Sequence, residues 1–128
     1  MLTALQVRNY VLIDSLEIDF PEGLIIITGQ TGAGKSILMG ALGLVMGSKA
    51  DASMLSEGAE NCIVEAEFDV EPGDAGILNI IDESGGEWDN GHLIIRRVVN
   101  RSGRSRAFVN DSPVSVQVLQ DLSSNLID

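Results

Sequence analysis

The chain has 128 residues, of which 45% are hydrophobic, and a formal net charge of -11; it has room for one folded domain and is too apolar for a disordered chain. Because phosphate backbones are bound mostly by clustered Lys and Arg, the acidic balance argues against a surface that mainly binds nucleic acid. The longest apolar stretches, residues 24–27 and 37–46, are far shorter than the roughly 18–20 residues that cross a bilayer, so no membrane span is predicted.

The N-terminal quarter of the chain predicts three strands. Apolar residues alternate with polar ones around Leu5 and Val7 and again over residues 16–20, which is typical of half-buried strands. Residues 24–27 are an unbroken aliphatic run, as expected of a central strand that is covered on both faces. A Pro-Glu-Gly turn separates this third strand from the second.

A mostly buried helix is predicted to follow. Apolar residues recur with a helical period from Ser36 onward, and Gly47 is a natural stop at the C-terminal end. Gly40 and Gly43 inside the helix each cost about 1 kcal/mol relative to alanine. Such a cost is tolerable where a helix must lie close against a sheet, so we expect that packing here.

The next predicted strand covers residues 62–70 and has one buried and one acidic face. Its apolar residues alternate with Glu65, Glu67 and an aspartate. Cys62 is expected to be a small core residue. As the single cysteine it cannot form an internal disulfide, which fits a reducing cytoplasm.

The C-terminal third predicts a hairpin and a helix. Residues 77–81 are apolar but too few to assign to a helix or a strand, whereas residues 93–99 and 106–109 predict an antiparallel hairpin. Ser115 can cap a final helix, and a new strand is expected from Asn125. The apolar stripe of the final helix consists of Val118, Leu119, Leu122 and Leu126.

Residues 29–36 match the phosphate-binding pattern G-x-x-x-x-G-K-[ST] at each fixed position, between the predicted central strand and helix. The glycines let backbone N–H groups turn inward around a β-phosphate; Lys35 reaches the β- and γ-phosphates, and the Ser36 hydroxyl can bind Mg²⁺. The alternative is a glycine-rich turn that matches by chance. The predicted nucleotide-binding residues are Gly29, Gln30, Thr31, Gly32, Ala33, Gly34, Lys35 and Ser36.

Several kinds of nucleotide protein share this loop. Residues 82–85 spell the D-x-x-G of a GTPase, and residues 48–51 loosely resemble its guanine motif, but the two stand in the wrong order. Asp82 is also a poor Walker B acid, because the preceding run is interrupted, and a solvated turn is expected there. A small kinase and a non-catalytic interaction module with the same fold stay open as alternatives.

Five of the eight basic residues fall within the predicted hairpin. They can contact DNA phosphates, a partner's acidic surface or, in a kinase, the substrate phosphates. We favour a solvated hairpin whose arginines keep an edge strand from pairing with other chains. His92 has no partner cluster that suggests metal binding or general-base chemistry. The five basic residues are Arg96, Arg97, Arg101, Arg104 and Arg106.

Specific strings and their order resemble the N-terminal head segment of the RecN family, the SMC-like DNA repair ATPases of bacteria. The strings are NYVLIDSLEI, TGQTGAGKSIL, ALGLVMG, KADAS and GRSRAFVN. The resemblance implies an α/β P-loop NTPase fold, an ABC/SMC-type head lobe with an antiparallel β portion. Residues 1–128 would then be the N-terminal part of the head, which binds ATP and Mg²⁺ and functions in repair of DNA double-strand breaks.

The resemblance also implies partners that lie outside this sequence. In this family the signature motif, the Walker B acid and the catalytic glutamate belong to a distant C-terminal half of the head, so no catalytic residue is predicted here and the chain alone is expected to be inactive. Two heads dimerise around ATP, and the full-length protein acts on DNA in the bacterial cytoplasm, associated with the nucleoid.

Two departures from the family pattern concern possible contacts to the nucleotide. Relatives tend to have an arginine where this chain has Ser56-Glu57-Gly58, and SMC relatives have polar residues where Val11 and Leu12 stand. Near the first strand, only three residues are left as candidate nucleotide contacts: Arg8, Asn9 and Tyr10.

Overall fold

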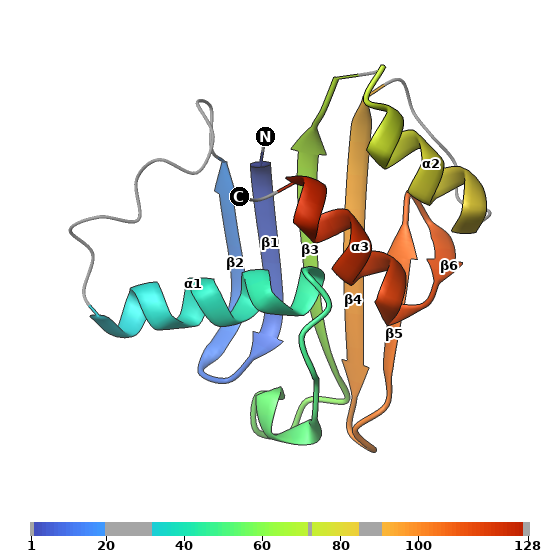
Figure 1. Ribbon diagram of the computed structural model, residues 1–128. Helices are drawn as coiled ribbons and strands as arrows, with labels where there is room; N and C mark the ends of the chain where they lie inside the picture. The colour runs from blue at the N-terminus through green and yellow to red at the C-terminus, as the bar shows by residue number, and fades with distance from the viewer. Residues whose placement is uncertain (1, 20–31, 72, 85–90, 127–128) are drawn as a thin grey trace.

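A six-stranded sheet organises the computed structural model, which describes residues 2–19, 32–71, 73–84 and 91–126 (Figure 1). The described elements follow one another as β1 (Leu2–Tyr10), β2 (Ile13–Asp19), α1 (Gly32–Val45), the short 3₁₀ helix η1 (Ala52–Met54), β3 (Asn61–Asp69), α2 (Ala75–Ser84), β4 (His92–Asn100), β5 (Ser105–Val109), β6 (Ser112–Val114) and α3 (Val116–Leu126). The predicted central strand over residues 24–27 lies outside the described residues.

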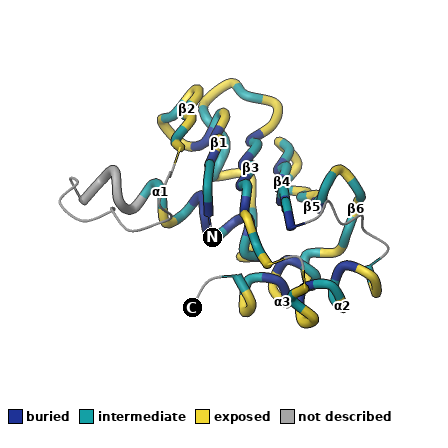
Figure 2. The backbone as a smooth tube through the Cα atoms, turned by 90° about the horizontal axis from the view of Figure 1, so that it is seen from above, coloured by how far each residue is buried: buried dark blue, intermediate teal, exposed yellow. Residues whose placement is uncertain are grey.

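The strands lie in the order β2-β1-β3-β4-β5-β6, and each is antiparallel to its neighbours. The helices α1, α2 and α3 all lie on one face of this sheet (Figures 1 and 2). We call this side the helix-covered face and the opposite side the helix-free face. The antiparallel β portion expected from the sequence is therefore confirmed.

The alternation of side chains along β3 places the core between the sheet and the helices. Cys62 and Val64 are fully buried on the helix-covered face, while Glu65 and Glu67 are partly exposed on the other. This is the one-sided strand that the sequence predicts. Helices contribute Ala41, Leu42, Leu44, Val45, Ile77, Ile81, Leu119 and Leu122 to the same core.

The helices agree with the predictions except at their boundaries. Helix α1 begins at Gly32, four residues before the expected start at Ser36, and Gly47 with a φ of 96° follows its end. The undecided segment around Ile77 is helix α2, so its last turn replaces the predicted solvated turn at Asp82. The expectation of a new strand from Asn125 is wrong, because Asn125 lies in the last turn of α3.

A short strand that the sequence did not predict, β6, borders the sheet. Asn110 and Asp111, with φ of 47° and 69°, form a two-residue turn between β5 and β6, and positive φ at both positions is the signature of a type I′ turn. The edge-strand interpretation of the arginine hairpin is therefore wrong, since β4 and β5 both have a neighbour on each side. No helix in the described ranges is long and apolar enough to span a membrane.

Candidate nucleotide-binding site

The phosphate-binding motif leads directly into α1. Residues 29–31 lie outside the described residues, and the remaining motif residues, from Gly32 to Ser36, form the start of α1. The earlier helix start is compatible with phosphate binding by backbone N–H groups, because the first four N–H groups of a helix have no partner within the helix. These N–H groups and the helix dipole favour an anion at this end.

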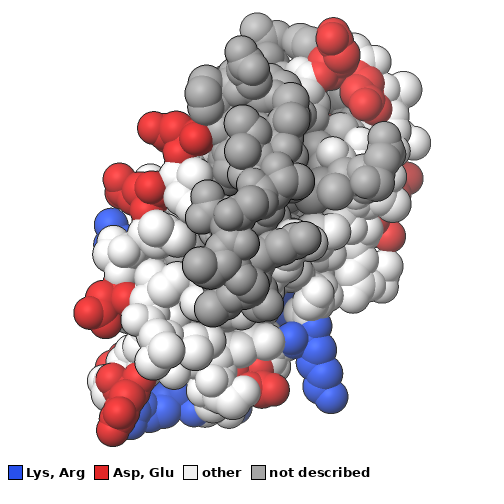
Figure 3. Space-filling view, turned by 90° about the vertical axis from the view of Figure 1, so that its left-hand side faces the viewer, with Lys and Arg blue, Asp and Glu red and all other residues white. Residues whose placement is uncertain are grey.

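The first turn of α1 contains no acidic residue, so no carboxylate repels a phosphate there. The helix crosses the helix-covered face, with its C-terminal end over β3 and its N-terminal end beyond the edge strand β2 (Figure 1). On the side toward which the N-terminal end points, acidic and basic side chains both lie along the margins of the described surface (Figure 3).

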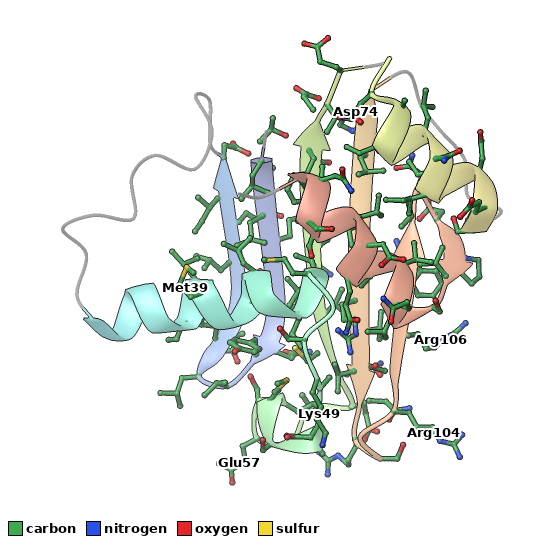
Figure 4. The ribbon with its side chains drawn as sticks, in the orientation of Figure 1. Met39, Lys49, Glu57, Asp74, Arg104 and Arg106 are labelled. Carbon is green, nitrogen blue, oxygen red and sulfur yellow. The ribbon has the colours of Figure 1, made fainter. Side chains whose placement is uncertain are left out.

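Close packing holds the middle of α1 on the sheet. A β-carbon at Gly40 would collide with the hydroxyl of Tyr10, and one at Gly43 would lie 3.1 Å from the Ser48 hydroxyl oxygen. The two glycines therefore let the helix approach its neighbours, as the sequence predicts. Met39, on the other side of the helix, is 53% exposed (Figure 4).

The structure does not bring the three candidate residues of β1 together. Arg8 lies on the helix-free face, where it lines a cavity of about 340 Å³ with Gln6, Ile63, Glu65 and Arg96. Tyr10 is buried beneath α1. Asn9 has a φ of 56°, and its carbonyl accepts a hydrogen bond from the Ser56 backbone at 2.9 Å. The three residues therefore have different environments, on opposite faces of the sheet and in its turn.

The loop after α1 supports the turn between β1 and β2. Val11, with a φ of 51°, donates its backbone N–H to the Met54 carbonyl at 2.9 Å, and the Ser56 hydroxyl donates to the Ile13 carbonyl at 3.2 Å. Ser56 therefore contacts the backbone of β1 and β2 next to this turn. Glu57 is exposed and points away from the sheet (Figure 4).

The five arginines have different environments. Arg96 and Arg106 lie over the ring of Phe108 on the helix-free face, 4.6 Å and 5.3 Å from its centroid. Arg101 donates to the Ala59 carbonyl, and Arg104 and Arg106 extend away from the sheet (Figure 4). The hairpin is part of the sheet, which disfavours a kinase lid. The solvated interpretation is wrong for the fifth residue, Arg97, which is 2% exposed.

Asp82 and His92, the other candidate groups, lie on α2 and β4. Asp82 is exposed in the last turn of α2, which excludes a Walker B strand at this place. His92 begins β4 with its Nδ1 atom 3.4 Å from Asp69. Across the described ranges there is no group of three or more His, Cys, Asp or Glu side chains able to hold a metal.

Two buried acids near α1 have shifted pKa values. Burial raises the pKa of the Cys62 thiol to about 11, so the thiol stays protonated and unreactive at neutral pH. The pKa of Tyr10 is also raised, first by burial and second by the nearby Cys62. Because burial is the main cause of both shifts, they fit two side chains shielded from water between the sheet and α1 and do not point to a catalytic role.

The family is shown by comparison with known proteins. A profile described as the RecF/RecN/SMC N terminal domain matches residues 1–127. DNA repair protein RecN of Haemophilus influenzae is 38% identical over 128 residues, covering 99% of this chain and 23% of the relative. RecN of Streptomyces coelicolor is 38% identical over 123 residues, covering 96% and 21%. The chain thus spans less than a quarter of the length of these curated relatives.

Solved structures share the fold. A chain from a study of ATP-driven dimerization and DNA stimulated activation of SMC ATPases superposes with a TM-score of 0.71 at 21% identity, covering 96% of this chain and 77% of that one. The recombination mediator protein RecF with ATPrS gives 0.68 at 19% identity, covering 93% and 29%. The fold class predicted from the sequence is confirmed, and the chain belongs to the RecF/RecN/SMC N-terminal domain family.

Proposed function

We propose that the chain is the ATP- and Mg²⁺-binding N-terminal segment of a RecN-like ATPase that acts in DNA double-strand break repair and recombination. The observation that carries the proposal is the phosphate-binding motif at the start of α1, a helix that packs on the sheet of an SMC-type head lobe. The relatives' name, DNA repair protein RecN, supports the biological process.

The roles follow from the chemistry of the motif. The backbone N–H groups of residues 29–34 would hold the β-phosphate, Lys35 would neutralise charge on the β- and γ-phosphates, and the Ser36 hydroxyl would bind the metal. Bound Mg²⁺ supplies a further positive charge against the phosphate oxygens. The absence of acidic residues from the first turn of α1 fits this assignment.

This segment would bind ATP without turning it over. Phosphoryl transfer also needs a positioned water and groups that stabilise developing charge, and the resemblance assigns these to the C-terminal half of the same head. In the whole protein we expect that half to complete the site, two heads to dimerise around ATP, and DNA to be the target in the bacterial cytoplasm, associated with the nucleoid.

Thermal unfolding with Mg·ATP tests the proposal. A ligand that binds only the folded state adds about 2.7 kcal/mol at a hundredfold excess over Kd, which raises the midpoint by on the order of 10 °C for a chain of this size. We expect this rise in the parent chain and its loss in Lys35→Ala. The matched control is Lys49→Ala, because Lys49 is exposed in the loop beyond the other end of α1 (Figure 4).

A non-catalytic interaction module is the alternative. It predicts no response of the midpoint at millimolar Mg·ATP, in the parent as in Lys35→Ala. Robust steady-state hydrolysis by the chain alone, abolished by Lys35→Ala, would instead contradict the assignment of the catalytic groups to another part of the protein.

A further inference from the structure

Arg97 differs from the other arginines of the hairpin because its charged side chain is buried in the core. It lies on β4 in the same alternating series as Leu93 and Ile95, so its side chain enters the helix-covered face. Among the side chains whose burial the structure describes, it is the single buried charged one. A buried charge is costly unless it is paired or well hydrogen-bonded, so the groups around this guanidinium define its role.

The hydrogen bonds of Arg97 join three elements. Its Nη1 atom donates to the carbonyls of Leu44 and Ser48, each at 2.8 Å, and its Nη2 atom donates to the Ser105 hydroxyl oxygen at 3.0 Å. Leu44 lies in the last turn of α1, Ser48 lies just beyond it, and Ser105 begins β5. One side chain therefore ties the end of α1 to the centre of the sheet.

The counter-charge is the end of the helix itself. Neither of the two ion pairs found among the described side chains involves Arg97, and its Nε atom is buried without a partner. The last four carbonyls of a helix have no partner within the helix and carry the negative end of its dipole. Arg97 places a full positive charge against that end, and burial lowers the pKa of its guanidinium without discharging it at neutral pH.

The contacts of Arg97 lie at the more deeply buried part of α1. Among the α1 side chains that the structure describes, residues 37–45, the fully buried ones are Ala41, Leu42, Leu44 and Val45, and Ile37 and Leu38 are partly buried against the same core. The Gln120 side chain of α3 adds a hydrogen bond to the Gly47 carbonyl at 2.9 Å. With a rise of 1.5 Å per residue, the motif end of α1 lies about 18 Å from Leu44. A tilt of ~5° about Leu44 would therefore move the motif end by ~1.5 Å.

That displacement bears on the nucleotide site because motif residues 32–36 form the start of α1 itself. A change in the direction of α1 therefore moves the backbone N–H groups of its first turn.

We propose that Arg97 is a positioning residue for the nucleotide site: by binding the Leu44 carbonyl in the last turn of α1 and the Ser48 carbonyl just beyond it, Arg97 sets the direction of the helix whose start is formed by motif residues 32–36. The nucleotide part of this proposal rests on the proposed function. The planar fork of arginine suits the task, because it reaches two carbonyls and a hydroxyl at once.

Two substitutions and a control test the proposal in the 128-residue chain. Arg97→Met removes the charge and all three hydrogen bonds, and Arg97→Lys keeps the charge on a shorter group that cannot form the fork. Arg104→Met is the matched control, since Arg104 is exposed in the same hairpin and no helix contacts its side chain in Figure 4. All measurements are made well below each variant's thermal midpoint, so that the unfolded fraction does not affect them.

Residual dipolar couplings of backbone amides, measured without nucleotide, report the direction of α1 relative to β3 and β4. We expect the couplings of α1 to leave the parent's alignment in Arg97→Lys and further in Arg97→Met, and to keep it in Arg104→Met. Mg·ATP titrations should then show Kd rising about 3–10-fold in Arg97→Lys and more than 10-fold in Arg97→Met, with Arg104→Met within twofold of the parent.

The two arms separate the possible failures. If the parent does not bind Mg·ATP, the proposed function fails, and the couplings still decide whether Arg97 directs α1. If the parent binds and a folded Arg97→Lys matches it in both couplings and Kd, the positioning role is overturned. If Arg97→Met does not fold, Arg97→Lys alone decides. If Arg97 has only a structural role, Arg97→Lys should have a lower thermal midpoint, but its folded form should bind Mg·ATP with the parent's affinity.

Discussion

The hydroxyl of Tyr10 occupies the space that a side chain at Gly40 would need. Tyr10 ends β1 and is 7% exposed, and Gly40 lies in the middle of α1. Because the buried tyrosine ring cannot swing aside, this contact sets how closely the helix approaches the sheet. The contact explains why a helix-disfavouring residue stands at the centre of the helix that begins in the phosphate-binding motif.

Gly40→Ala should therefore destabilise the chain although alanine favours helices by about 1 kcal/mol. Forcing a methyl group against Tyr10 costs roughly 1–3 kcal/mol. In a Tyr10→Phe background the nearest ring carbon lies 3.4 Å from the new methyl group, so the cost should disappear. Urea unfolding of the two single variants and the double variant measures the coupling, expected at 1 kcal/mol or more.

Gly76→Ala in α2 is the matched control for this set of Gly40 and Tyr10 variants. The nearest atom to a β-carbon there belongs to the exposed side chain of Asn125, at 3.0 Å, which can move, and the Asp74 carboxylate is at an ordinary contact distance of 3.4 Å. Gly76→Ala should be neutral or stabilising by up to about 1 kcal/mol. Equal effects of alanine at positions 40 and 76, with no coupling to Tyr10, would contradict the packing argument.

The turn between β5 and β6 depends on Asn110 in two ways. Its φ of 47° suits asparagine or glycine, and its side chain accepts a hydrogen bond from the Ile94 backbone N–H at 2.8 Å. Asn110→Gly keeps the conformation but loses the side-chain hydrogen bonds to the Ile94 N–H and the His92 carbonyl, and should cost about 1–2 kcal/mol. Asn110→Ala adds backbone strain of about 1 kcal/mol. Chemical unfolding that ranked alanine as the milder substitution would refute this account.

The sequence predicted most of the sheet because burial there follows a period of two. Residues 62–70 alternate so regularly that the strand and its buried face could be inferred, and the structure confirms both in β3. Residues 93–99 and 106–109 were predicted as a hairpin, which β4 and β5 confirm. The strand β6 escaped prediction because it has three residues and contains Pro113, which is rare inside strands. The segment around Ile77 was too short for either period to be recognised.

The site was predicted unevenly for a different reason. A motif identifies residues 29–36 through their chemistry, whereas the residues that hold α1 in place carry no motif. Arg97 was grouped with the exposed arginines by charge, although it stands in register with Ile95 and Val99 on the buried side of β4. The alternation of buried positions along this strand could have identified Arg97 as buried, but the arginines were grouped by their charge instead.

Cys62 gives stability a pH dependence on the alkaline side. Its pKa is raised from an ordinary value of 9.0 to about 11, so the stability that the protonated thiol contributes is complete below pH 9 and is lost as pH rises toward 11. Between pH 8.5 and 10.5 the parent should lose about 1.5–2 kcal/mol more than Cys62→Ala, since one pKa unit corresponds to about 1.36 kcal/mol.

Urea unfolding of both chains across this pH range checks the prediction. Tyr10 is present in both chains, and Cys62 contributes to its raised pKa, so the difference between the two chains reports the thiol together with its coupling to Tyr10. Parallel pH profiles for the parent and Cys62→Ala would show that the thiol is not as dry as its fully buried position indicates.

The central claim is that the backbone N–H groups of the motif bind the triphosphate of ATP, and amide NMR of the ¹⁵N-labelled chain tests it most directly. Titration with Mg·ATP should move the amide resonances of residues 29–36 furthest and saturably, and should leave them in place in Lys35→Ala but not in Lys49→Ala. Saturating shifts confined to another surface, or no shift in the motif at millimolar Mg·ATP, would contradict the account.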